Sequence, residues 1–258
     1  MKIRIKYSKN GAMRFVGHLD TLHYFQKAFR RTGLKTGFSK GFSPHMLLTF
    51  ASPLSTGMTT EGDYLDIVIE EEMSPSEVLD RLSAQMSEGF TVTEAVRLRE
   101  EAKTPMALLR AASYIITPAL VPEDKARLIF SYADAFMEQE SFTVVKKTKK
   151  GSREEDIRPL IYRLEACADA ECDRPALFLM CASGSIEHLK PDLVMDSLSG
   201  FAASADEACR LAFGEEDEAL LWHYHRTDLY GVDPQILKPG EPLGAHIPQP
   251  LLTVDIYQ

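Results

Sequence analysis

The sequence predicts an α+β protein in which strands and helices alternate along the first hundred residues. Residues 2–7 alternate basic and apolar side chains, which is the period-two pattern of a half-buried strand. Over residues 17–32 apolar side chains recur at helical spacing, and Gly33 stands where such a helix would end. Because both patterns occur in succession, helices are expected to pack on a sheet.

The following elements extend this alternation to residue 97. Strands are expected at residues 46–51, 64–69 and 90–97. A helix is expected from residue 75 to about residue 86, with Ser74 as its cap and Glu77 three residues later. The resulting βαββαβ order is that of the ferredoxin-like fold, which we predict for residues 1–100.

A polar break at residues 100–105 predicts a domain boundary. Residues 105–226 are expected to form a second α+β domain, for which a degenerate copy of the first is one interpretation, and residues 227–258 an extended segment rich in Pro and Gly. Its expected strands are 113–118, 142–147, 160–167 and 176–181. Its expected helices are 122–139, 191–197, 203–213 and 217–224. A last strand is expected at 251–257.

Composition narrows the function class. The 258 residues are 45% apolar, enough for two modest cores, and no stretch approaches the roughly 20 apolar residues of a membrane span. The N-terminus lacks the apolar run of a signal peptide, so a cytoplasmic protein without a membrane partner is expected. The four cysteines form no CxxC pair and no CxxxCxxC run, so no cofactor or metal of its own is expected.

Charge is unevenly distributed along the chain. The net charge is −9, which argues against a non-specific coat for nucleic acid. Residues 1–50, however, carry ten bases against the single acid Asp20, a local balance of +9. The remaining residues therefore carry −18, so the N-terminal part is basic within an acidic chain.

Four segments carry a resemblance to a known family. They are RFVGHLDTLHYFQKAFRRTGL (14–34), SKGFSPHMLLTFASPLSTG (39–57), EGDYLDIVI (61–69) and KKTKKGSREEDIRPLI (146–161). Together they resemble a bacterial and archaeal family known only as radical-SAM-linked, of unknown function. The resemblance implies a radical-SAM enzyme as a partner and hints at RNA. It supplies no catalytic residues.

A first candidate site surrounds the start of the first helix and the loop that follows it. Its residues are Arg14, His18, Asp20, Ser39, Lys40, Ser43 and His45. Helix N-terminal amides and the glycines of the loop favour a phosphate-bearing ligand. The structural alternative is that Asp20 caps the helix and His18 packs under the loop. A metal is disfavoured, because His18, Asp20 and His23 cannot all face one ion from a regular helix.

A second candidate site is a basic hairpin around Gly151. Its residues are Lys146, Lys147, Lys149, Lys150, Arg153 and Arg158. Such a hairpin can lie along a nucleic acid, although exposed lysines also protect an edge strand from aggregation. Two aromatic residues near the first site, Phe38 and Phe42, can stack on unpaired bases, or they can belong to the core.

The function expected from these features is recognition. The chain is predicted to be an accessory protein of a radical-SAM enzyme that binds RNA or another phosphate-rich ligand. One alternative is an enzyme in its own right, an endoribonuclease or small-molecule transferase using His18, Asp20 and His45. Another is a protein-binding adaptor without RNA affinity. The GxSxG, P-loop and GxGxxG motifs are absent from the sequence.

Overall fold

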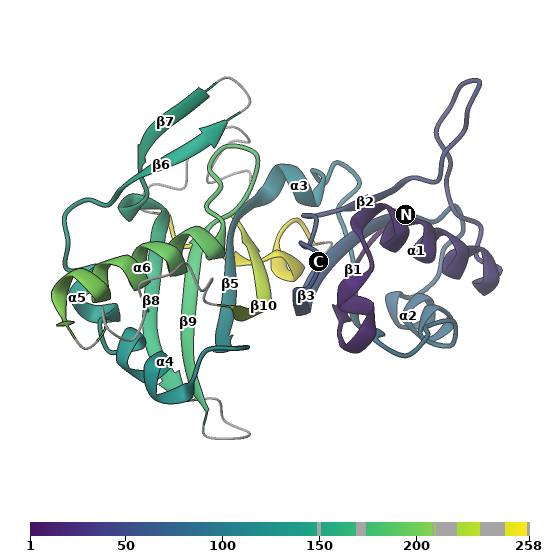
Figure 1. The fold of residues 1–258 in the computed structure, drawn as a ribbon. Helices are drawn as coiled ribbons and strands as arrows, with labels where there is room; N and C mark the ends of the chain where they lie inside the picture. Colours follow the sequence, from purple (N-terminus) through teal and green to yellow (C-terminus); the bar gives the residue numbers. More distant parts are fainter. Residues whose placement is uncertain (149–150, 169–173, 208, 210–220, 233–245, 257–258) are drawn as a thin grey trace. The chain divides into compact units, whose positions relative to one another are not determined.

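The computed structural model describes residues 1–148, 151–168, 174–207, 209, 221–232 and 246–256 (Figure 1). The chain divides into two compact units. Unit 1 comprises Met1–Ala112, Gly184–Ile186 and His225–Gln258, and unit 2 comprises Ser113–Ser183 and Glu187–Tyr224. The predicted α+β class is confirmed. The predicted domain boundaries stay predictions, because compact units need not coincide with domains.

Unit 1 begins with the element order that the sequence predicts. Its elements are β1 (Lys2–Lys9), the 3-10 helix η1 (Gly11–Phe15), α1 (His18–Thr32), β2 (Leu48–Phe50), β3 (Thr59–Val68), α2 (Pro75–Ser83) and β4 (Phe90–Arg97). β1 lies between β4 and β3, β2 pairs with β3, and all these pairings are antiparallel. The ferredoxin-like assignment itself stays a prediction.

One hydrophobic core joins the helices α1 and α2 to one face of this sheet. Ile3, Ile5 and Tyr7 of β1 are buried there, together with Phe25 and Phe29 of α1. These positions follow the two periods seen in the sequence, two in the strand and about 3.6 in the helix. Both predicted helix ends are observed: Gly33 adopts a φ of 73° after α1, and the Ser74 side chain accepts a hydrogen bond from the Glu77 amide before α2.

The opposite face of β1 carries three of its four basic side chains, and all three are engaged within the molecule. The Arg4 guanidinium donates to both carboxylate oxygens of Asp66, at 2.8 and 2.9 Å. Lys6 pairs with Asp228 at 3.3 Å, and Lys2 donates to the main-chain oxygens of Glu100 and Ala102. Although the strand reads as basic in the sequence, it therefore offers no free basic surface.

The strand β10 (Trp222–Gly231) corrects the sequence prediction of a helix at residues 217–224. Residues 222–224 form the start of this strand, and residues 217–220 lie outside the described residues. Farther along, β10 runs parallel to β3, with His225 opposite Thr59. Gly62 of β3 permits the close approach, because an added Cβ would lie 2.2 Å from the Thr227 carbonyl oxygen.

The end of unit 1 also differs from prediction. Instead of a strand over 251–257, the chain forms β11 (Gln249–Pro250) and the 3-10 helix η3 (Leu251–Thr253), and Ile256 makes an isolated bridge to Leu98. The reason lies in Arg4, whose guanidinium binds the carbonyl oxygens of Leu251 and Val254. These carbonyls serve a buried cation rather than a neighbouring strand. Unit 1 also holds the short helix α3 (Pro105–Leu108).

Unit 2 has its own sheet and a separate hairpin. Its elements are β5 (Leu109–Pro118, which begins in unit 1), α4 (Glu123–Phe130), α5 (Ala133–Met137), β6 (Thr143–Thr148), β7 (Gly151–Asp156), η2 (Arg158–Leu160), β8 (Ile161–Ala168), β9 (Pro175–Ala182) and α6 (Pro191–Ala205). The sheet has the order β5-β9-β8, and β6 pairs only with β7 in the described residues. No helix in the described part of the chain is long and apolar enough to span a membrane.

Two helix predictions in unit 2 need correction. The helix expected over 122–139 is two helices, because the Ser131 hydroxyl bonds back to the Leu128 carbonyl and the chain turns between α4 and α5. The helix expected to end at residue 197 continues to Ala205, since Leu198 and Ala202 are buried. That extension takes in the start of the helix expected over 203–213, of which residues 208 and 210–213 lie outside the described residues.

Candidate functional site

The first predicted site falls into two separate groups. Arg14 lies in η1, and His18 and Asp20 lie in the first turn of α1. Ser39, Lys40, Ser43 and His45 lie in the loop that connects α1 to β2. Within the described residues, no hydrogen bond, ion pair or ring contact joins the two groups. A single ligand site formed by both groups therefore stays a prediction.

The residues near the start of α1 contact neighbouring side chains or lie exposed at the helix end. The His18 ring packs edge-on against Phe50 of β2, with ring centroids 5.5 Å apart. The Arg14 guanidinium stacks on the exposed ring of Phe15 at 4.7 Å. Asp20 does not cap the helix, since Gly17 holds the cap position without a side-chain hydrogen bond. Asp20 is instead exposed, where its charge suits the helix N-terminus.

The loop residues form an ordered hairpin, which we call the 38–46 hairpin. Phe38 and Met46 form an isolated antiparallel bridge, and the Ser39 amide donates to the His45 carbonyl at 2.8 Å. The Ser39 hydroxyl oxygen accepts from the His45 amide at 3.0 Å and lies 2.8 Å from Nδ1 of the same residue. Figure 1 shows this segment projecting from the sheet between α1 and β2. Its tip, including Lys40, Phe42 and Ser43, is exposed.

Exposed cations follow one another along the chain from α1 to this hairpin. We call it the α1–hairpin surface; its residues are Lys27, Arg30, Arg31, Lys35 and Lys40, all exposed. In the part of the chain that the structure describes, none of the five forms an ion pair with a carboxylate. Arg31 donates to the neutral side chain of Gln85, and Glu71 accepts from the main-chain amide of Lys35. The excess positive charge of the N-terminal part is thus displayed here.

The second predicted site is only partly described. Lys146 and Lys147 lie on β6, with Lys146 opposite Arg153 and Lys147 opposite Ser152 of β7, while Lys149 and Lys150 lie outside the described residues. Arg153 is exposed. Arg158 is not part of the hairpin, because it begins η2 and its guanidinium donates to the carbonyls of Met137 and Ile161. It anchors the chain below the hairpin.

Unit 1 contains a buried group of charged residues that the sequence did not lead us to predict. Asp63 is 1% exposed, and its carboxylate accepts from the Arg226 guanidinium and from the Tyr7 hydroxyl, the latter at 3.2 Å. Nearby Lys9 is also buried and donates to the Val16 carbonyl at 2.6 Å. Burial raises the pKa of Asp63, which Arg226 opposes, and burial lowers the pKa of Lys9. The alternation of side chains along the strand could have predicted the burial of Asp63, because Asp63 lies on the same face as Leu65 and Ile67.

His225 lies between a hydroxyl and a carboxylate. Its Nδ1 is 2.8 Å from the Thr59 hydroxyl, and its Nε2 is 3.8 Å from a carboxylate oxygen of Glu61. The order of groups is that of a nucleophilic triad, but the Thr59 side chain is buried and the imidazole–carboxylate distance exceeds a hydrogen bond. The contact between Thr59 and His225 therefore connects β3 to β10 rather than activating a nucleophile.

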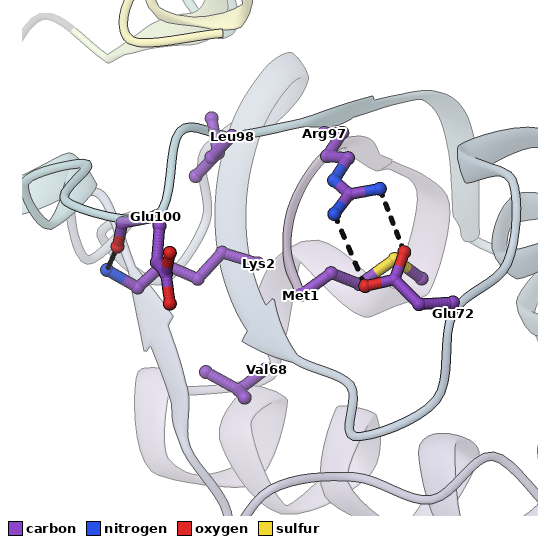
Figure 2. A pocket seen from close by; sticks show the side chains of 7 residues that line it. All are labelled: Met1, Lys2, Val68, Glu72, Arg97, Leu98 and Glu100. Carbon is purple, nitrogen blue, oxygen red and sulfur yellow. Dashed lines mark hydrogen bonds and ion pairs between the residues drawn. The ribbon is translucent and has the colours of Figure 1, made fainter. Parts of the chain in front are cut away.

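A cavity of about 500 Å³ lies at the N-terminal end of β1 (Figure 2). It is lined by Met1, Lys2, Val68, Glu72, Arg97, Leu98 and Glu100. Arg97 and Glu72 form a two-point ion pair at 2.9 and 3.3 Å, and Lys2 binds the Glu100 carbonyl at 2.7 Å. These described lining residues include no histidine, cysteine or hydroxyl side chain. No group of three metal-ligating side chains occurs among the described residues of the chain.

Comparisons with known proteins add a family. A family model described as "Uncharacterized protein conserved in bacteria (DUF2344)" matches residues 2–191. No curated protein matches the chain. Among solved structures, DyPB from Rhodococcus jostii RHA1 in crystal form 2 is 13% identical, over 76% of this chain and 81% of its own. Its TM-score is 0.18, and a likeness at that level carries no argument.

Proposed function

The chain belongs to this family of uncharacterized bacterial proteins, DUF2344, and we propose that it is a recognition protein that binds RNA through the α1–hairpin surface. One observation carries the proposal. Five exposed cations, none paired with a carboxylate in the described chain, occur between residues 27 and 40 of a protein whose net charge is −9. In an acidic protein, such a cluster is well suited to an anion supplied by a ligand.

The spacing of the cations favours a polyanion over a single phosphate. Lys27 and Arg31 are four residues apart on one helix, a rise of about 6 Å. Lys35 and Lys40 follow α1 along the chain, so the exposed cations are distributed over the helix, the segment after it and the hairpin. A nucleic-acid backbone presents successive phosphates along a line. RNA in place of DNA is the expectation that the sequence resemblance supports.

The enzyme alternative has no supporting contact within the described residues. His18 packs on Phe50, His45 contacts Ser39, and Asp20 has no hydrogen-bond partner among the described side chains. General acid–base catalysis needs its groups within hydrogen-bond reach of one substrate. Recognition needs only a surface, and the α1–hairpin surface supplies one.

A charge-reversal experiment tests the proposal. The double variant Lys27→Glu/Arg30→Glu is compared with Lys103→Glu/Lys190→Glu, which makes the same charge change at exposed residues outside the surface. The probe is a fluorescent single-stranded RNA of about 12 nucleotides, a length within the range of single-strand sites. We expect the first variant to lose more than about tenfold in affinity, because phosphate contacts become repulsions. Equal losses in both variants would reject the surface.

The proposal includes a radical-SAM enzyme as the partner that acts on the bound RNA, as the resemblance implies. Affinity purification of the tagged chain, with and without nuclease, tests this part. We expect a radical-SAM enzyme to co-purify and RNA to be recovered from the untreated sample. RNA without such an enzyme would remove the partner but keep the RNA proposal. An enzyme without RNA would favour the adaptor.

A further inference from the structure

Phe42 is an aromatic residue at the tip of the 38–46 hairpin, and its side chain is fully exposed. Burying a phenylalanine contributes about 1.5–3 kcal/mol in general, and this ring gains none of that within the chain. Phe38, at the base of the hairpin, is also exposed. Single exposed apolar residues are common, so the surroundings of Phe42 decide whether the exposure has a use.

The hairpin holds Phe42 on an ordered support. The Ser39 amide donates to the His45 carbonyl, and the His45 amide donates to the Ser39 hydroxyl oxygen, which also contacts the His45 imidazole. At the base, the Gly37 amide donates to the Val68 carbonyl of β3, and the Leu47 amide donates to the Gly37 carbonyl. Because the loop is closed before any ligand arrives, binding through Phe42 loses less conformational entropy than binding through a flexible loop.

Cations stand close to this ring along the chain. Lys40 is two residues before Phe42, and two residues of extended chain span at most about 7 Å. Lys35 lies between the hairpin and α1, and it belongs to the same α1–hairpin surface. An aromatic ring beside a cationic row is the combination by which proteins hold single strands, with bases stacked on rings and phosphates on cations.

We propose that Phe42 stacks on an unpaired base of the bound RNA, so that the substrate class is single-stranded RNA or an unpaired loop. This inference rests on the proposed function, and it adds the strandedness of the ligand. A base inside a duplex is already stacked on both faces, so the Phe42 ring can contribute to binding only where a base is unpaired. The aromatic ring, rather than its apolar bulk, is the required feature.

Three substitutions of Phe42 separate stacking from simple apolar contact. The probes are a single-stranded RNA of about 12 nucleotides and a duplex of the same length. For the single strand, we expect Phe42→Ala and Phe42→Leu each to weaken binding about tenfold, equivalent to about 1.4 kcal/mol. Duplex binding should not change. The control is Leu120→Ala, which removes an exposed apolar side chain elsewhere.

The Phe42→Trp variant supplies a second readout. Affinity for the single strand should be retained, and the new indole should be quenched when a base stacks on it. The natural Trp222 is 8% exposed and provides a constant background. Because the Phe42 side chain makes no contact that stabilises the fold, all three variants should unfold like the unchanged protein.

The outcomes distinguish this inference from the proposed function. If Lys27→Glu/Arg30→Glu weakens binding but the Phe42 variants do not, stacking is wrong and the charged surface stands. If Phe42→Leu binds as well as the unchanged chain while Phe42→Ala does not, the side chain contributes apolar contact without aromatic stacking, and stacking is again wrong. If the charge reversal has no effect, the proposed function itself fails.

Discussion

Arg226 and Asp63 are 2% and 1% exposed, and they form an ion pair inside unit 1. Tyr7 donates to the same carboxylate, and burial raises the pKa of Asp63, an effect that the charges of Arg226 and Lys9 oppose. A buried pair of this kind is costly to break, because the remaining partner stays desolvated without compensation. The residues therefore connect β10 to the core through charge, in addition to the burial of its apolar residue Leu229.

The variant Arg226→Met should lower the free energy of unfolding by about 3–5 kcal/mol, since it leaves the Asp63 carboxylate buried without its guanidinium. Urea denaturation measures the change. Arg81→Met provides the matched control, because Arg81 pairs with Glu77 on the exposed face of α2 and should cost less than about 1 kcal/mol. Similar costs for both variants would show that burial of the Asp63–Arg226 pair is unimportant.

The burial of Cys181 predicts how fast its thiol is alkylated and how stability depends on pH. Burial raises the pKa of its thiol to about 12, whereas Cys167 is exposed. In the unfolded chain a thiol titrates near about 8.5. Between these values the unfolded state loses a proton that the folded state keeps, so Cys181 should reduce stability as the pH rises above about 8.5. At pH 8, iodoacetamide should modify Cys167 and spare Cys181, as peptide mass spectrometry would detect; rapid modification of both would contradict the buried placement.

At the scale of elements, periodicity predicted β1, α1, α2 and β4 closely, because each has one buried face and a clear end. Gly33 and Ser74 mark two of those ends by local chemistry that is readable in the sequence. The first three residues of β10 were predicted as the end of a helix because Trp222 and Tyr224 lie in a dense polar and aromatic segment without simple alternation. Its pairing with β3 depends on Gly62, a contact about 160 residues away that no local pattern reveals.

The 38–46 hairpin yields a prediction about local order. Ser39→Ala removes the hydroxyl that accepts from the His45 amide and contacts its ring. We expect faster hydrogen exchange at residues 39–46 and a change in global unfolding free energy below about 1.5 kcal/mol, since the contacts are exposed. Ser43→Ala, at an exposed position in the same loop, is the control and should leave exchange unchanged. Unaltered exchange in Ser39→Ala would mean that Ser39 does not order the hairpin.

At the scale of the whole molecule, composition predicted the charge asymmetry but not where the charge would be available. Of the ten N-terminal bases, Lys2, Arg4, Lys6 and Lys9 are held by internal partners. Those on α1 and the hairpin are displayed, which depends on which helix face is buried and on pairing between distant residues. The sequence singled out Lys40 and the neighbouring loop, whereas Lys27 and Arg30 entered only as counted charges.

The salt dependence of RNA affinity tests the central claim most directly. For the single-stranded probe, the logarithm of the binding constant should fall linearly with the logarithm of salt concentration, by about 0.7 per phosphate contact. Lys27→Glu/Arg30→Glu should make that slope shallower by about 1.4, while Lys103→Glu/Lys190→Glu should leave it unchanged. A slope near zero in the unchanged protein, or the same slope in all three proteins, would contradict RNA recognition by the α1–hairpin surface.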